Sequence, residues 1–156
     1  MLIIFDLDDT LYDRSGQVRD EHREEDIQKI TVFPGVIDFL RTSTAKKILL
    51  TKETDLGLQE AKINTLKIGP FFDKIIICHS DTEKKIQFQN MKKRYPAQKI
   101  WSVGDRLDTD ILFAKEQGFA TIQLKHGKYK NLPANDANKP DYIITTFAEL
   151  NNILSP

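Results

Sequence analysis

This sequence has little cysteine and no excess of either charge. Its 156 residues include one cysteine, and Lys plus Arg equals Asp plus Glu at 23 each. One cysteine cannot form an internal disulfide, and Cys78 ends an apolar run, so we interpret it as a small buried residue in a reducing compartment. Without net positive charge there is no basic field to hold nucleic acid or an anionic membrane. We expect neither partner.

Long apolar runs and linkers are also missing. The longest apolar run near the start, Leu2 to Phe5, is interrupted by Asp6 and is too short for a signal peptide or a membrane span. The sequence shows no repeat, low-complexity tract or Gly/Ser linker. We therefore predict a cytoplasmic protein with a single domain over residues 1–156, a length at which roughly 70% of the unfolded surface can be buried.

Short apolar runs alternate with amphipathic stretches along the chain. The runs are Leu2 to Phe5, Lys47 to Leu50, Lys74 to Cys78, Ile100 to Val103, Ala120 to Leu124 and Tyr142 to Ile144. Each is too short for a helix and several are β-branched, which is typical of strands buried on both faces. Helical spacing separates them, for example at Leu58, Ala61 and Thr65. This alternation predicts an α/β fold, a three-layer, doubly wound, Rossmann-like and mostly parallel sheet.

The segment from Asp13 to Lys29 departs from this alternation. Ten of its seventeen residues are charged and few are apolar. Such a charge run is either a solvated excursion or a small lid over the site, since it directly follows the first strand. We describe residues 13–31 as a short charged flap.

Chemistry in a parallel sheet is expected just after the strands, because ligands bind outside their carboxyl ends. The first apolar run is followed by Asp6 and Asp8. Two carboxylates this close at a buried strand end repel each other, and each is costly to ionise unless a cation neutralises them. Mg²⁺, which prefers oxygen ligands, would do so. Alone, such a pair could equally cap the following turn.

A second acidic motif follows the run that ends at Val103. Gly104 permits a tight turn, Asp105 leaves the strand end, and Asp110 lies near a helix start, where negative charge is favoured. Helix capping could explain Asp108 or Asp110 without a metal. It explains Asp105 less well.

A hydroxyl and an ammonium complete the set. Thr51 directly follows the second apolar run, and Lys84 opens a helical stretch that continues through Phe88 and Met91. Each alone has an ordinary explanation, as a turn residue and as a solvated cation. Around a carboxylate-bound metal, however, they are the groups that phosphoryl transfer requires, because its transition state spreads negative charge over oxygens. Lys85 could replace Lys84, but the spacing to Phe88 and Met91 favours Lys84.

Together these residues resemble the four motifs of the haloacid dehalogenase-like (HAD) hydrolases. The first motif resembles Asp6-Leu7-Asp8-Asp9-Thr10, the second Thr51, the third Lys84, and the fourth Gly104-Asp105 with Asp110. The motifs occur in the right order and the resemblance covers essentially the whole chain.

The resemblance implies a sheet with the Asp6 strand in its middle, flanked by the strands of Thr51 and Asp105. It implies that Asp6 attacks phosphorus and forms an aspartyl-phosphate, while Asp8 acts as general acid and then as general base. Thr51 and Lys84 would bind the phosphoryl group.

The resemblance also implies a Mg²⁺ site. Its ligands would be Asp6, the backbone carbonyl of Asp8, and Asp105, with support from Asp110 or, alternatively, Asp108. Lys52 stands where many relatives carry Asn or Ser. It would place a phosphate-binding cation near the substrate entrance, or it would be merely solvated.

Family members usually insert a cap domain after the first motif or between the second and third. Here the first gap holds only the flap, and one helix and one strand fill the second, so we expect a minimal cap. An open site suits a macromolecular phospho-substrate, or a small substrate enclosed by the neighbouring subunit of a homo-oligomer. The neutral net charge favours a small phosphorylated substrate over nucleic acid.

The predicted function is therefore a magnesium-dependent phosphatase acting on a phosphate monoester. A dehalogenase of the same superfamily is disfavoured by Asp8, whose protonating role suits phosphate. A receiver-like signalling module would also accept phosphate on an aspartate, but its paired acids close the first strand while the acceptor ends a later one. A catalytically silent metal-binding scaffold is the third alternative.

Overall fold

A computed structural model describes residues 1–154. Strands and helices alternate along it in the order β1 (Leu2–Phe5), α1 (Arg14–Gln17), α2 (Glu24–Ile27), α3 (Val36–Thr42), β2 (Lys46–Lys52), α4 (Leu58–Leu66), a 3₁₀ turn (Gly69–Phe71), β3 (Lys74–Cys78), α5 (Asp81–Arg94), β4 (Ile100–Gly104), a π-helical turn (Leu107–Ile111), α6 (Leu112–Glu116), β5 (Ala120–Leu124), β6 (Tyr142–Ile144), a 3₁₀ turn (Phe147–Glu149) and α7 (Leu150–Leu154).

The strands form one six-stranded sheet in the order β3-β2-β1-β4-β5-β6, and every neighbouring pair is parallel. The chain runs outward from β1 to β3 and then returns to β4 on the other side of β1. The carboxyl ends of β1 and β4 are therefore the point at which the strand order reverses, where such sheets bind ligands. The predicted α/β fold and the central place of the Asp6 strand are confirmed.

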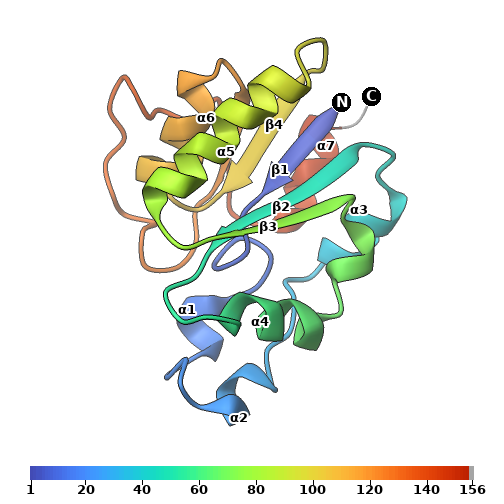
Figure 1. Cartoon of the computed structure of the whole chain (residues 1–156), viewed down its shortest axis with the longest axis vertical. Coiled ribbons are helices and arrows are strands. Elements are labelled where there is room, and N and C mark those ends of the chain that lie inside the picture. The colour runs from blue at the N-terminus through green and yellow to red at the C-terminus, as the bar shows by residue number, and fades with distance from the viewer. Residues whose placement is uncertain (155–156) are drawn as a thin grey trace.

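Two apolar layers cover the sheet. On one face, Phe5 and Leu49 pack with side chains of α3 and α7. On the other, Ile4 and Ile48 pack with Phe88 of α5 and with α6. Alternate residues of β1 thus enter opposite layers, as the two-residue period of a strand requires. Figure 1 shows α5 and α6 on one side of the sheet and α7 on the other. The three-layer prediction is confirmed.

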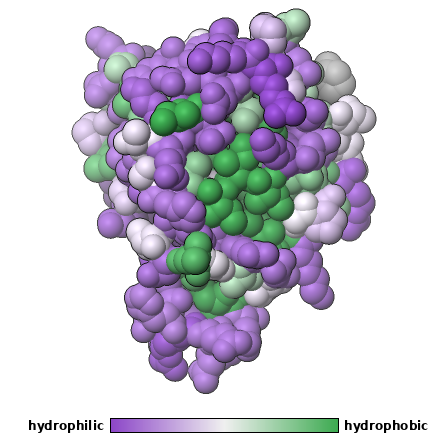
Figure 2. Space-filling model, viewed as in Figure 1, coloured by the Kyte–Doolittle hydropathy of each residue, from purple (hydrophilic) through white to green (hydrophobic). Residues whose placement is uncertain are grey.

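The edge strands differ from the prediction that the strands are buried on both faces. Ile75 in β3 is 38% exposed and Ile143 in β6 is 55% exposed. Figure 2 shows an apolar area surrounded by hydrophilic residues, in the part of the face that β3 crosses in Figure 1. An edge strand has a neighbour on one side only, so a continuous apolar sequence does not ensure that both of its faces are covered.

The buried face of α4 also differs from the prediction. Its apolar spacing indicated Leu58, Ala61 and Thr65, but Ala61 is exposed. The side chains that α4 buries are those of Gln59, Lys62, Ile63 and Leu66. The periodicity rule assigns apolar residues to the interior, and here two polar residues occupy the inner face because they contact the candidate site.

The charged flap forms α1 and α2, which Figure 1 places with α4 beyond the carboxyl ends of the strands. Val18 and Ile27 are buried and attach the flap to the core. Its charged residues are mostly exposed, as expected. Among residues 1–154, no helix combines the length and apolar character that crossing a membrane would require.

Candidate active site

Three carboxylates meet at the carboxyl ends of the two central strands. Asp6 follows β1 and Asp105 follows β4, and the last paired residues of the two strands, Phe5 and Val103, lie side by side. Asp110 enters from the π-helical turn after β4. One oxygen from each of Asp6, Asp105 and Asp110 lies within 4.8 Å of the others. All three residues are buried.

Lys84 is the cation inside this group. Its Nζ lies 2.7 Å from Asp6 Oδ1 and 2.6 Å from Asp110 Oδ1, and it is 4% exposed. Lys85 instead pairs with Glu116 at 2.8 Å on the outer side of α5. The structure thus brings Lys84 to the carboxylates and leaves Lys85 away from them.

Burial and mutual repulsion govern the ionisation of the acids. Burial, with the charge of Asp110 adding to it, raises the pKa of Asp6 to about 7, although Lys84 opposes the rise. Burial and the charges of Asp110 and Asp6 raise the pKa of Asp105 to about 10. Burial alone would lower the pKa of Lys84, but Asp110 and Asp6 hold it above its usual value, so the ammonium stays charged.

These groups fit a divalent metal ion. Three buried carboxylates lie together, and Lys84 pairs with two of them, Asp6 and Asp110. Burial, together with repulsion between the acids, raises the pKa of Asp6 and of Asp105. A hard cation that binds carboxylate oxygens would relieve this repulsion. Asp108, the alternative to Asp110, does not join the group, because its carboxylate pairs with Arg106 at 2.7 Å on the surface.

Thr51 lies within β2, whose seven residues extend one position beyond it. Its hydroxyl is buried and accepts a hydrogen bond of 2.8 Å from Gln59 Nε2. Because the Thr51 oxygen is the acceptor in that bond, its own hydrogen remains available to a second acceptor. A phosphate oxygen in the cavity is one such acceptor.

Asp8 is half-buried and its carboxylate is held by three donors. Tyr12 Oη donates at 2.5 Å and Lys62 Nζ at 2.9 Å, both to Oδ1, while Gln59 Nε2 donates to Oδ2 at 2.8 Å. Burial and the charge of Asp8 raise the pKa of Tyr12 above its ordinary value, so the phenol remains a donor. Asp8 and Asp6 line the same cavity of about 280 Å³.

Lys52 also lines this cavity, at the end of β2. Its Nζ pairs with Asp81 Oδ1 at 2.7 Å, at the start of α5. The cation is therefore beside the site and already has an acidic partner.

Comparison with known proteins agrees with this geometry. A HAD-hydrolase-like family model matches residues 83–150. The glyceraldehyde 3-phosphate phosphatase of Methanocaldococcus jannaschii is 35% identical over 130 residues, which are 78% of this chain and 56% of that protein. The enzyme of the same name from Pyrococcus furiosus is 34% identical over 101 residues, or 62% and 42% of the two chains.

A solved structure extends the agreement to the fold. The crystal structure of the HAD-hydrolase YfnB from Bacillus subtilis bound to magnesium aligns with a TM-score of 0.75 at 15% identity, over 99% of this chain and 98% of that one. The family model, the curated relatives and the solved structure all show similarity to HAD-like hydrolases. The chain spans about half the length of the curated relatives it matches.

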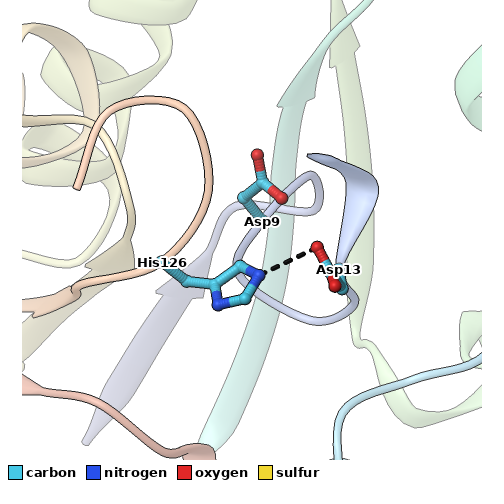
Figure 3. A group of neighbouring side chains, drawn as sticks. All are labelled: Asp9, Asp13 and His126. Atoms are coloured by element: carbon cyan, nitrogen blue, oxygen red, sulfur yellow. Dashed lines mark hydrogen bonds and ion pairs between the residues drawn. The ribbon is translucent and has the colours of Figure 1, made fainter. Parts of the chain in front are cut away.

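Side-chain contacts hold the flap beside the site. His126, after β5, places Nε2 2.8 Å from Asp13 Oδ1 in the flap, next to Asp9 (Figure 3). Asp9 accepts hydrogen bonds from the backbone N–H and the hydroxyl of Ser15. Asp9, Asp13 and His126 could also surround a metal, but Asp13 additionally accepts from Gly16 N, so contacts within the protein already engage both carboxylates.

Sequence reasoning missed three residues of the site. Gln59, Lys62 and Glu21 line the cavity, and Lys62 Nζ joins Asp8 to Glu21, at 2.9 and 2.8 Å. In the sequence they resemble surface residues of a polar helix and a charged flap. The available signal was their spacing, because Gln59 and Lys62 lie three residues apart and so face the same way on a helix.

Gly104 provides a test of the packing around Asp110. A Cβ at this position would overlap the side chain of Asp110, so Gly104→Ala is expected to lower the free energy of unfolding by about 1–3 kcal/mol. Thermal unfolding measures this loss. In Gly69→Ala the added Cβ would meet Ile63 at an ordinary 3.5 Å, so that control should unfold close to wild type. Equal melting temperatures for Gly104→Ala and wild type would contradict the described packing.

Proposed function

We propose that this chain is a magnesium-dependent phosphatase that hydrolyses a phosphate monoester through an aspartyl-phosphate on Asp6. The observation that carries the proposal is the position of the Asp6 carboxylate. It lines a cavity at the reversal point of the sheet, touches Lys84 at 2.7 Å, and lies beside the carboxylates of Asp105 and Asp110.

In the first step, an oxygen of Asp6 attacks phosphorus and the bond to the ester oxygen breaks. Asp8, protonated on Oδ2 because Tyr12 and Lys62 occupy Oδ1, gives this proton to the departing oxygen, so the alcohol leaves neutral. In the second step, Asp8 takes a proton from a water molecule, whose oxygen attacks phosphorus and releases inorganic phosphate from Asp6. Asp6 and Asp8 then return to their starting forms.

The surrounding groups stabilise charge and orient the phosphate. Lys84 offsets the negative charge of Asp6 and of the transferring group, and Thr51 donates its hydroxyl hydrogen to a phosphate oxygen. Mg²⁺ would be held by Asp6, Asp105 and the backbone carbonyl of Asp8, with Asp110 in support. When bound, it would neutralise and orient the phosphate charge.

The substrate that we propose is a small phosphorylated metabolite. The two curated relatives are named for a three-carbon phosphate ester, glyceraldehyde 3-phosphate. A cavity of about 280 Å³ suits a ligand of that size. Lys52, beside the cavity, is the cation that we propose for contact with the outer phosphate oxygens.

Metal removal tests the proposal. After dialysis against a chelator, hydrolysis of 4-nitrophenyl phosphate is expected to fall about a hundredfold or more and to return when Mg²⁺ is added. An undiminished rate in chelator would contradict the metal requirement. A chain that becomes stably phosphorylated without releasing phosphate would favour the receiver-like alternative.

A further inference from the structure

Two side chains of α4 donate hydrogen bonds to the Asp8 carboxylate, one to each of its oxygens. Lys62 Nζ binds Oδ1 at 2.9 Å and Gln59 Nε2 binds Oδ2 at 2.8 Å. The two residues stand one helical turn apart and are buried on the same face of α4. Because both oxygens are held, the carboxylate cannot rotate about its terminal torsion without breaking a bond.

The side-chain amide of Gln59 is oriented with its nitrogen toward several acceptors, which leaves its oxygen in an unfavourable position. Its Nε2 also lies 2.8 Å from Thr51 Oγ1 and 3.0 Å from the carbonyl of Lys52, so three acceptors surround it. Among residues 1–154, its buried Oε1 has no hydrogen-bond partner. Flipping the amide would point that oxygen at the Asp8 carboxylate, so the acceptors fix the orientation. A buried unpaired oxygen is unfavourable, and it is tolerated here where the nitrogen serves two site residues.

Lys62 is a buried lysine whose ammonium pairs with two acidic residues of the site. Its side chain is 1% exposed, while its partners Asp8 and Glu21 are 29% and 21% exposed. Lysine is almost never fully buried unless it is paired. Arg14 Nε in turn binds Glu21 at 3.1 Å. The flap thus binds the same ammonium that binds Asp8.

We infer that Lys62 and Gln59 are positioning residues that aim Asp8 at the ester oxygen of the substrate. This inference rests on the proposed function, in which Asp8 protonates that oxygen. The flap residue Glu21 belongs to the same arrangement, because it shares the ammonium of Lys62. The flap therefore supports the catalytic geometry through its contact with α4, whether or not it moves as a lid.

Two substrates of similar shape separate positioning from general damage. The leaving oxygen of 4-nitrophenyl phosphate departs as a stabilised anion, whereas that of phenyl phosphate is more basic and needs a proton. In Lys62→Met, kcat/KM is expected to fall about ten- to a hundredfold for phenyl phosphate and only a few-fold for 4-nitrophenyl phosphate. Asp8→Asn should show the same selectivity, and adding Lys62→Met to it should cause little further loss.

Lys47→Met is the matched control. Lys47 is also buried, but it binds the carbonyls of Ser43 and Ala45 at the opposite end of β2. Its replacement should leave the ratio of the two rates unchanged. Should Lys62→Met fail to fold, Lys62→Met/Glu21→Gln also removes one of the two carboxylate charges that Lys62 had paired, and its rate ratio is read in the same way.

The outcomes distinguish this inference from the proposed function. If wild type hydrolyses both substrates with Mg²⁺, and Lys62→Met slows both equally or neither, the positioning role is wrong while the phosphatase stands. A selective loss on phenyl phosphate supports it. If wild type hydrolyses neither substrate with Mg²⁺, both the function and the inference fail.

Discussion

Asp6→Asn is expected to reduce phosphatase turnover by about 10⁴- to 10⁶-fold, the range reached when a covalent nucleophile is removed from a hydrolase. Asparagine has nearly the same shape, but its amide cannot attack phosphorus and return as a carboxylate. It also loses the ion pair with Lys84. Steady-state hydrolysis of 4-nitrophenyl phosphate with Mg²⁺ measures the effect. After rapid acid quenching, a phosphorylated chain should be found for wild type and not for the variant.

Asp141→Asn is the isosteric control. Asp141 precedes β6 at the opposite end of the sheet and accepts hydrogen bonds from the backbone and hydroxyl of Thr121. Its replacement should leave turnover near wild type. Turnover by Asp6→Asn at a wild-type rate would refute Asp6 as the nucleophile.

The sheet and the residues at its carboxyl ends could be predicted because both follow short-range rules. Five of the six expected runs end within one residue of a strand end in the structure, and the run before Thr51 ends two residues early. In a parallel sheet the carboxyl ends share one edge, so residues that directly follow β1 and β4 must lie close together. That is why Asp6 and Asp105 meet although 99 positions separate them.

Helical spacing also placed Lys84 correctly relative to the core. Phe88 and Met91 follow it at four and seven positions, and all three are buried on one face of α5. The next residue, Lys85, is turned about 100° around the helix and meets Glu116 instead. The apolar residues of α5 show which face of the helix is buried, and this predicts which lysine reaches the carboxylates.

The supporting residues could not be predicted, because their role depends on contacts between distant segments. Gln59 and Lys62 are polar and would normally be assigned to a solvent-exposed face. Their burial follows from Asp8 and Glu21, which are 54 and 41 positions from Lys62. Neither α4 nor the flap shows an unusual pattern in the sequence. Their opposite charges form a buried network only when the tertiary structure brings them together. A polar stripe at helical spacing beside an acidic motif is the signal that could have been used.

Lys84→Met is expected to damage both stability and catalysis. Methionine fills much of the same space but leaves Asp6 and Asp110 without their shared cation in the interior. Breaking a buried ion pair on one side typically costs about 3–5 kcal/mol of folding free energy. Losing the charge beside the phosphoryl group should lower kcat/KM about a hundred- to a thousandfold. Chemical denaturation and hydrolysis of 4-nitrophenyl phosphate measure the two losses.

The pH dependence of the stability loss follows from the pKa of Asp6. In the metal-free protein this pKa is raised to about 7 from 3.8, so the folded state favours the protonated acid, and stability falls as pH rises through this range. Lys84 opposes the rise, so removing it extends the range upward, and the stability gap between wild type and variant should widen above about pH 7. Lys85→Met, which breaks the half-exposed pair with Glu116 and a cation–π contact with Phe113, should cost about 1 kcal/mol or less at any pH. A gap that stays constant from pH 5 to pH 9 would mean that Lys84 does not stabilise the ionised carboxylates.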